Sequence, residues 1–195
     1  GELCESLKGG GILCLACGHR CRIRPGRRGV CLVRFHDGAG LRVPWGYVAG
    51  LQVDPIEKKP FFHALPGARA LSFGMLGCDY KCPYCQNAST SQVLRDPEMV
   101  GRAESATPEG IAALAVREGC EVVTSTYNEP LITSEWGAAV MRAAKAAGLV
   151  GSYVSNGNAT PEVLAYIRPV VDLYKVDLKG FDKRRYAELG GRIGN

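Results

Sequence analysis

An alternation of strand-like and helix-like segments between residues 70 and 189 constrains the fold of this chain more than any other feature of its sequence. Four apolar runs have the length and composition of buried strands, and they span 70–76, 122–126, 149–154 and 170–178. The stretches that follow them have helical periodicity, and they span 107–119, 134–147, 160–167 and 183–189. Two of these helices begin with Thr-Pro-Glu, at Thr107 and Thr160, where threonine can cap the helix and proline can take its first position. Because strand–helix–strand connections are right-handed, the alternation predicts an α/β fold with a parallel sheet.

Polar residues follow each predicted strand. The first run leads into a cysteine-rich loop, the second into Asn128-Glu129-Pro130, and the third into Ser155-Asn156-Gly157. The fourth ends in Asp177-Leu178-Lys179. Parallel α/β folds bind ligands at the carboxyl ends of their strands, so these residues indicate a common site. The alternative is a set of ordinary strand-to-helix loops.

The last predicted strand has charges on one face. Alternation separates an apolar set from a charged set, which are Tyr174, Val176 and Leu178, and Lys175, Asp177 and Lys179. We expect the apolar set to pack on helices and the charged set to point inward. Inward charges are costly without a partner. That partner is either a bound zwitterion or, as the alternative, a structural ion pair between aspartate and lysine.

Cys78, Cys82 and Cys85 lie within eight residues, directly after the first predicted strand. A [4Fe-4S] cluster normally takes four thiolates, so three on one loop suggest a cluster with one iron left open. An open position distinguishes a catalytic metal site from a closed structural one. The alternative is a zinc knuckle completed by a distant ligand.

A second group of cysteines, Cys14, Cys17, Cys21 and Cys31, has the number of thiolates that a tetrahedral metal site needs. Zinc is the preferred metal, although a mononuclear iron or a cluster suits four thiolates equally. His19 could substitute as a ligand, and a redox or incidental set of thiols is the alternative.

The nine cysteines occur without a signal peptide or an apolar stretch long enough to cross a bilayer. This usage favours a reducing compartment, the cytoplasm, in which thiols serve metals rather than disulfides. The net charge of +5 is mild, and its densest part is the arginine-rich stretch 20–28. A solvated or partner-facing patch explains that stretch better than nucleic-acid binding does, and no membrane partner is expected.

The spacing CX3CX2C, with Tyr84 just before the last cysteine, resembles the signature of the radical S-adenosylmethionine (SAM) enzymes. The resemblance implies a partial or full (β/α)6 barrel, of which about four units precede Asn195, so the barrel is expected to be truncated. It implies a [4Fe-4S] cluster on Cys78, Cys82 and Cys85 whose open iron binds SAM. Reductive cleavage of SAM to a 5′-deoxyadenosyl radical would need a low-potential donor of the flavodoxin or ferredoxin type.

The later motifs resemble the pyruvate formate-lyase activating enzyme group over about residues 70–180. Tyr127 and Asn128 replace the two glycines of that family's Gly-Gly-Glu-Pro motif, while Glu129 and Pro130 are kept. The segments 14–34, 54–59 and 127–130 resemble the radical SAM component of the AmmeMemoRadiSam system. The resemblance implies hydrogen abstraction from a protein or peptide, as in activases of glycyl radical enzymes. It assigns to SAM the residues Tyr84, Asn128, Glu129, Ser155, Asn156, Asp177 and Lys179, with Tyr84 against the adenine.

The expected organisation is a lead-in at residues 1–13, a cysteine-rich knuckle at 14–69 and a radical SAM core at 70–195. The knuckle is expected to carry a small sheet, from runs at 30–35, 41–43 and 45–53, and a charged connector at 54–60. The competing hypothesis is a non-catalytic interaction module in which both cysteine groups hold structural zinc.

Overall fold

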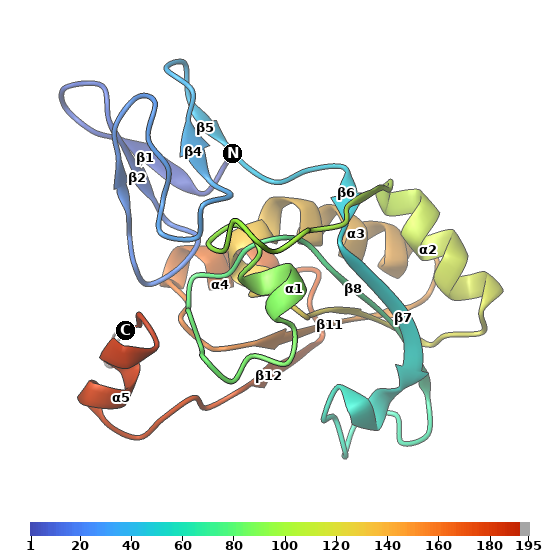
Figure 1. Cartoon of the computed structure of the whole chain (residues 1–195). Helices are drawn as coiled ribbons and strands as arrows, with labels where there is room; N and C mark the ends of the chain where they lie inside the picture. Colours follow the sequence, from blue (N-terminus) through green and yellow to red (C-terminus); the bar gives the residue numbers. More distant parts are fainter. Residues whose placement is uncertain (192–195) are drawn as a thin grey trace.

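A five-stranded sheet organises the computed structural model, which describes residues 1–191 (Figure 1). The strand order is β12-β11-β10-β8-β7. The first four of these are parallel, and they are β12 (Leu173–Val176), β11 (Val150–Ser155), β10 (Val122–Ser125) and β8 (Arg69–Gly74). The four strands therefore lie where the apolar runs predict them, in the parallel arrangement that the alternation requires.

The register of the sheet brings the carboxyl ends of its parallel strands together. Ser125 of β10 is opposite Phe73 of β8 on one side and Tyr153 of β11 on the other. Ser155, at the end of β11, is opposite Val176, at the end of β12. The loops that follow the four strands consequently start from one edge of the sheet.

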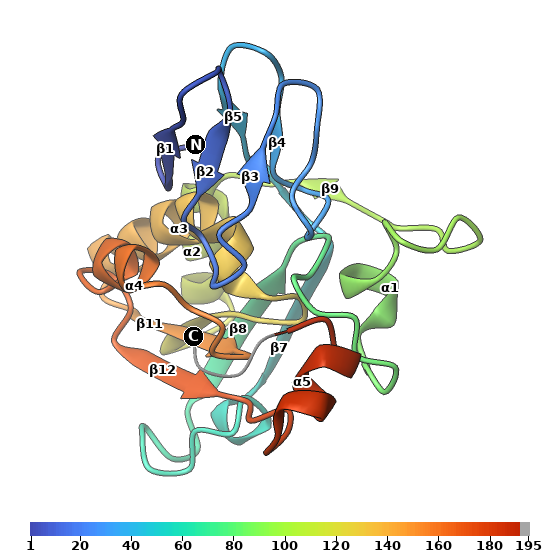
Figure 2. The ribbon, with the colours of Figure 1, turned by 90° about the vertical axis from the view of Figure 1, so that its left-hand side faces the viewer.

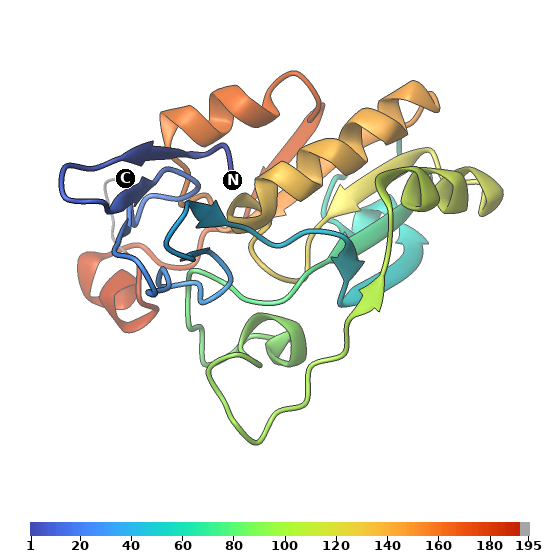
Figure 3. The same ribbon diagram turned by 90° about the horizontal axis from the view of Figure 1, so that it is seen from above.

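Three helices pack along one side of the sheet, and a short helix lies on the other side (Figure 3). The three are α2 (Pro108–Arg117), α3 (Ser134–Ala146) and α4 (Pro161–Ile167), and the short one is α1 (Ala88–Ser91). The side chain of Thr107 accepts a hydrogen bond from the Gly110 amide, and that of Thr160 accepts one from the Val163 amide. Both threonines are thus N-caps, as the repeated Thr-Pro-Glu predicts.

The core lies between this sheet and its helices. Phe73 and Tyr153 of the sheet and Trp136 of α3 are at most 1% exposed, as is Met141. Removing such apolar surface from water is the main driving force for folding, at roughly 25 cal/mol per Å². The remaining helical elements are α5 (Lys183–Glu188) and the 3-10 turns η1 (Ile56–Lys58) and η2 (Pro130–Thr133).

The cysteine-rich start of the chain forms small antiparallel strands beyond one end of α3 and α4 (Figure 2). One sheet consists of β1 (Cys4–Ser6), β2 (Ile12–Cys14) and β3 (Arg22–Ile23), and a hairpin pairs β4 (Phe35–His36) with β5 (Leu41–Arg42). Residues 1–13 are therefore more ordered than the predicted loose lead-in. Leu3 and Ile12 are buried members of the main core cluster, so these residues are packed against the rest of the molecule.

The predicted run 45–53 does not belong to an appended sheet. It divides into β6 (Tyr47–Val48), which pairs with β9 (Glu104–Ser105), and β7 (Gly50–Pro55), which runs antiparallel beside β8. The segment predicted as a connector thus begins inside the main sheet and continues into η1. No helix within residues 1–191 has both the length and the apolar character that crossing a bilayer requires.

Candidate functional site

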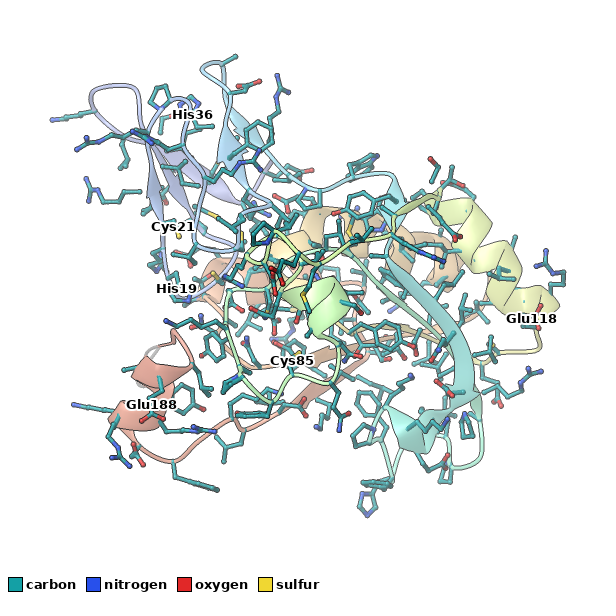
Figure 4. The ribbon with its side chains drawn as sticks, in the orientation of Figure 1. His19, Cys21, His36, Cys85, Glu118 and Glu188 are labelled. Atoms are coloured by element: carbon teal, nitrogen blue, oxygen red, sulfur yellow. The ribbon has the colours of Figure 1, made fainter. Side chains whose placement is uncertain are left out.

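The three cysteines of the loop after β8 line one cavity of about 340 Å³. Figure 4 shows Cys85 beside α1, near the middle of the molecule. The rest of the lining comes from the cysteine loop, from the α1 region and from the ends of β10, β11 and β12. It includes every residue that the sequence analysis assigned to SAM: Tyr84, Asn128, Glu129, Ser155, Asn156, Asp177 and Lys179. The parallel register thus brings segments about 100 residues apart in the chain to one site.

Glu129 is a buried carboxylate at the wall of this cavity, 3% exposed. The hydroxyl of Ser155 and the backbone amide of Asn156 each donate to its oxygens at 2.7 Å, and the Leu131 amide donates at 3.1 Å. Burial raises its pKa to about 8, with a further contribution from the charge of Asp79. A cation that binds next to Glu129 would therefore favour the ionised form of its carboxyl group.

Asp79 is a second buried carboxylate, 2% exposed, which the sequence analysis did not single out. The side-chain amides of Asn156 and Asn158 donate to its two oxygens, each at 2.8 Å. These bonds tie the cysteine loop to the loop after β11. The sequence offered only a weak indication of this contact: Asp79 is next to Cys78, and Asn158 follows two residues after Asn156.

Asp177 and Lys179 line the cavity and also pair with each other, with Lys179 Nζ 3.0 Å from Asp177 Oδ2. Lys175 is also an ion-pair partner of Asp177. The structural ion pair, one of the two alternatives from the sequence, is therefore present, and the binding of a zwitterion by these residues stays a prediction.

The apolar face of the last strand is packed only in part. The ring of Tyr174 stacks on that of Tyr153, and its hydroxyl donates to Ser155 Oγ at 2.9 Å. Val176 and Leu178 are 50% and 62% exposed, however, rather than packed on helices. Val176 is the last residue of β12, which is the outermost strand on its side of the sheet within residues 1–191, and Leu178 lies beyond the end of that strand.

Tyr84 links the cysteine loop to the end of the last strand. Its hydroxyl donates to the backbone oxygen of Lys179 at 3.2 Å, and the Arg185 guanidinium lies 5.2 Å from the centre of its ring. The side chain is 48% exposed, so part of its surface stays open at the cavity.

The cysteine loop has the donor chemistry that an iron–sulfur cluster requires. All nine cysteines of the chain are free thiols. Burial raises the pKa of the Cys78 thiol well above its usual range, with a contribution from Asp79, and burial also raises that of Cys82. Bound iron would supply the positive charge that stabilises the thiolates, so three such groups on one cavity wall fit a cluster.

The N-terminal cysteines form a second cluster of thiols. The thiols of Cys17, Cys21 and Cys31 each interact electrostatically with that of Cys14. Cys31 accepts hydrogen bonds from the backbone amides that follow it. Figure 4 shows Cys21 at the base of the N-terminal strands, near His19.

Among residues 1–191, no set of three or more His, Cys, Asp or Glu side chains is arranged to hold a metal ion. A tetrahedral zinc site needs several side chains close enough to bind the same ion, so the N-terminal zinc site stays a prediction. In a [4Fe-4S] cluster each cysteine would bind a different iron, so the three thiols of the cysteine loop need not lie close enough to share one metal ion.

Comparison with known proteins identifies the class. Residues 74–195 match the model of the radical SAM superfamily, and the chain belongs to that superfamily. The family implies a [4Fe-4S] cluster and SAM as cofactors.

The uncharacterized protein MJ0808 of Methanocaldococcus jannaschii is 34% identical to this chain over 177 residues, which are 90% of the chain and 52% of that protein. The chain thus spans about half the length of this relative. The crystal structure of QueE from Escherichia coli is similar with a TM-score of 0.45 and 16% identity, over 68% of this chain and 60% of the QueE chain.

The pKa of Glu129 leads to a testable dependence of stability on pH. Because its folded-state pKa is raised to about 8, the stability it contributes is present below its unfolded pKa and is lost as pH rises through about 8. A Glu129→Gln variant cannot ionise at this position. In urea unfolding of the metal-free chain, we expect the variant to gain stability relative to wild type between about pH 6 and about pH 9. A difference that does not change with pH would contradict the raised pKa.

Proposed function

We propose that this chain binds a [4Fe-4S] cluster through Cys78, Cys82 and Cys85 and positions SAM against its open iron for reductive cleavage. The observation that carries the proposal is the single cavity shared by the three thiols and the polar ends of the parallel strands. A structural zinc knuckle would not need the buried carboxylate and the charged pair that also line it.

The chain's own residues would bind and orient the nucleotide. Ionised Glu129 would accept hydrogen bonds from the methionyl ammonium, since the approaching cation favours the charged form of a carboxylate whose pKa is about 8. Asp177 can accept hydrogen bonds from ribose hydroxyls, and Tyr84 offers a ring to the adenine. The cluster, when bound and reduced, supplies the electron that splits SAM into methionine and a 5′-deoxyadenosyl radical.

The proposed substrate is a protein or peptide from which hydrogen is abstracted, with a flavodoxin- or ferredoxin-type protein as the electron donor. The support is the likeness of Asn128-Glu129-Pro130, Ser155-Asn156-Gly157 and Asp177-Leu178-Lys179 to the pyruvate formate-lyase activating enzymes. The additional likeness of the N-terminal cysteine pattern to the AmmeMemoRadiSam component suggests the narrower assignment. The N-terminal cysteines are proposed as a second metal site, with zinc preferred.

Anaerobic reconstitution with iron and sulfide tests the proposal. We expect about four irons for the cluster, absorbance at about 400 nm, and 5′-deoxyadenosine when SAM and dithionite are added. Zinc bound tightly at both cysteine groups, with no 5′-deoxyadenosine formed, would instead favour a non-catalytic zinc module. Incubation with candidate glycyl radical proteins, read by electron paramagnetic resonance, then tests the substrate class.

A further inference from the structure

Tyr127, which stands where the related motif has glycine, adopts an unusual backbone conformation. Its φ of +70° lies in the left-handed region, which side-chain-bearing residues seldom enter. Such a conformation persists only where its surroundings hold it in place. Tyr127 lines the cavity and directly precedes Asn128 and Glu129, which line it as well, so its backbone conformation sets the path by which the chain reaches those two residues.

Two glycines form a slot for the Tyr127 ring. Gly50 of β7 and Gly74 of β8 are directly opposite each other in the sheet. A Cβ atom on Gly50 would lie 3.1 Å from Cδ2 of Tyr127, and one on Gly74 would lie 2.9 Å from its Cβ. The missing side chains therefore create the space that the ring occupies, which assigns a role to β7 at the site.

A buried lysine holds the other end of the ring. Lys59 Nζ lies 3.4 Å from the Tyr127 hydroxyl, 5.1 Å from the ring centre and 3.0 Å from Asp54 Oδ2. Lys59 is only 5% exposed, which is rare for lysine unless it is paired. Its neighbour Lys58 pairs with the same carboxylate at 2.8 Å, but its side chain is 67% exposed.

The residues after Tyr127 are held by separate contacts. Asn128 Oδ1 accepts a hydrogen bond from the Met75 amide at 3.0 Å, three residues before Cys78. Glu129 is held by the loop after β11. The turn 127–129 therefore connects the start of the cysteine loop, the polar end of β11 and, through Tyr127, the β7–η1 segment.

We infer that Tyr127 is a positioning residue for SAM, and that Lys59 and the Gly50–Gly74 slot act on SAM binding through it. The inference rests on the proposed function. It makes Lys59 and its partner Asp54 part of the binding apparatus, while the exposed Lys58 stays outside it. The turn presents Asn128 and Glu129 to the cavity in one orientation, and loosening its anchor would misplace both groups by a fraction of an ångström or more.

Two matched pairs of variants in the reconstituted full chain test the inference. Lys59→Met removes the anchor and keeps an apolar stem, and Lys58→Met removes the neighbouring charge on the same aspartate. We expect Lys59→Met to raise the KM for SAM about tenfold in 5′-deoxyadenosine formation, with iron content unchanged and kcat less affected. Lys58→Met should change KM less than about twofold. Lys59→Arg, which keeps the cation, should recover part of the affinity.

Gly50→Ala provides the second test, because the three atoms nearest to the added methyl group all belong to the Tyr127 ring. Its control is Gly40→Ala, where the described residues leave open space within 4 Å. We expect Gly50→Ala to raise the KM for SAM about threefold and Gly40→Ala to leave it unchanged.

The outcomes separate this inference from the proposed function. If wild type holds a cluster but neither binds nor cleaves SAM, the proposed function fails. If wild type cleaves SAM and Lys59→Met and Gly50→Ala match their controls in KM, the positioning role of Tyr127 is refuted. If Lys59→Met fails to retain its cluster, Gly50→Ala decides: a raised KM supports the inference and an unchanged KM overturns it.

Discussion

Cys82→Ser is expected to abolish 5′-deoxyadenosine formation, a fall of at least about 100-fold, together with loss of most of the bound iron. Cys82 lines the cavity with Cys78 and Cys85, and its thiol interacts electrostatically with Lys179 at the end of the last strand. A serine hydroxyl is a harder and far less acidic donor than a thiol, so it cannot replace a thiolate on iron. Iron and sulfide analysis and a chromatographic assay for 5′-deoxyadenosine measure the two effects.

Cys120→Ser is the matched control. Cys120 is also a free and buried thiol, but it lies just before β10, at the opposite end of that strand from the cavity. We expect this variant to retain its iron and its activity. If Cys82→Ser kept a full cluster while Cys17→Ser lost it, the cluster would have to be reassigned to the N-terminal cysteines.

The parallel core could be predicted because its signals are local. Each strand is a short apolar run, and Thr107 and Thr160 mark helix starts by bonds within three residues of themselves. Once the strands are parallel, their carboxyl ends must meet, which is why the residues at four separate strand ends could be assigned to one cavity. The last strand shows the limit of this reasoning. Alternation predicts which residues share its charged face, but it does not predict whether other side chains bury Val176, which is 50% exposed.

The contacts that hold the site rigid could not be predicted, because they are long-range and have no periodicity. The bond from Asn158 to Asp79 joins residues 79 positions apart, and the contact from Lys59 to Tyr127 joins residues 68 apart. No sequence motif indicates that the two residues of either pair are in contact. The antiparallel position of β7 was missed for the same reason. Most of its residues were predicted as a strand of the appended sheet, and no local signal indicates that its partner is β8.

A buried ion pair is one of the contacts that join the N-terminal strands to the core. Both guanidinium nitrogens Nη1 and Nη2 of Arg34 bond the carboxylate of Glu135, at 2.7 and 2.8 Å. Arg34 is 1% exposed and Glu135 is 3% exposed. The Leu3 amide also donates to this carboxylate, at 3.3 Å, so the pair connects the first residues of the chain to α3.

Arg34→Met is therefore expected to destabilise the chain by about 3–5 kcal/mol, because it leaves the Glu135 charge buried without its partner. For a chain of this size the loss corresponds to a fall in Tm of about 10 °C, measurable by thermal unfolding. Arg20→Met is the control, since the Arg20–Glu162 pair is 40% and 38% exposed and should contribute about 1 kcal/mol or less.

The pH dependence of this loss distinguishes an unpaired charge from a simple packing defect. Burial alone would raise the pKa of Glu135, but the hydrogen bonds and charge of Arg34 outweigh it and hold the pKa below its usual value. In wild type, the stability from this carboxylate is thus present above its unfolded pKa and lost as pH falls through the lower folded value. In Arg34→Met the pKa should instead rise, so the difference from wild type should shrink as acid protonates Glu135. A deficit of equal size at about pH 5 and about pH 8 would mean that lost packing, rather than the buried charge, causes the instability.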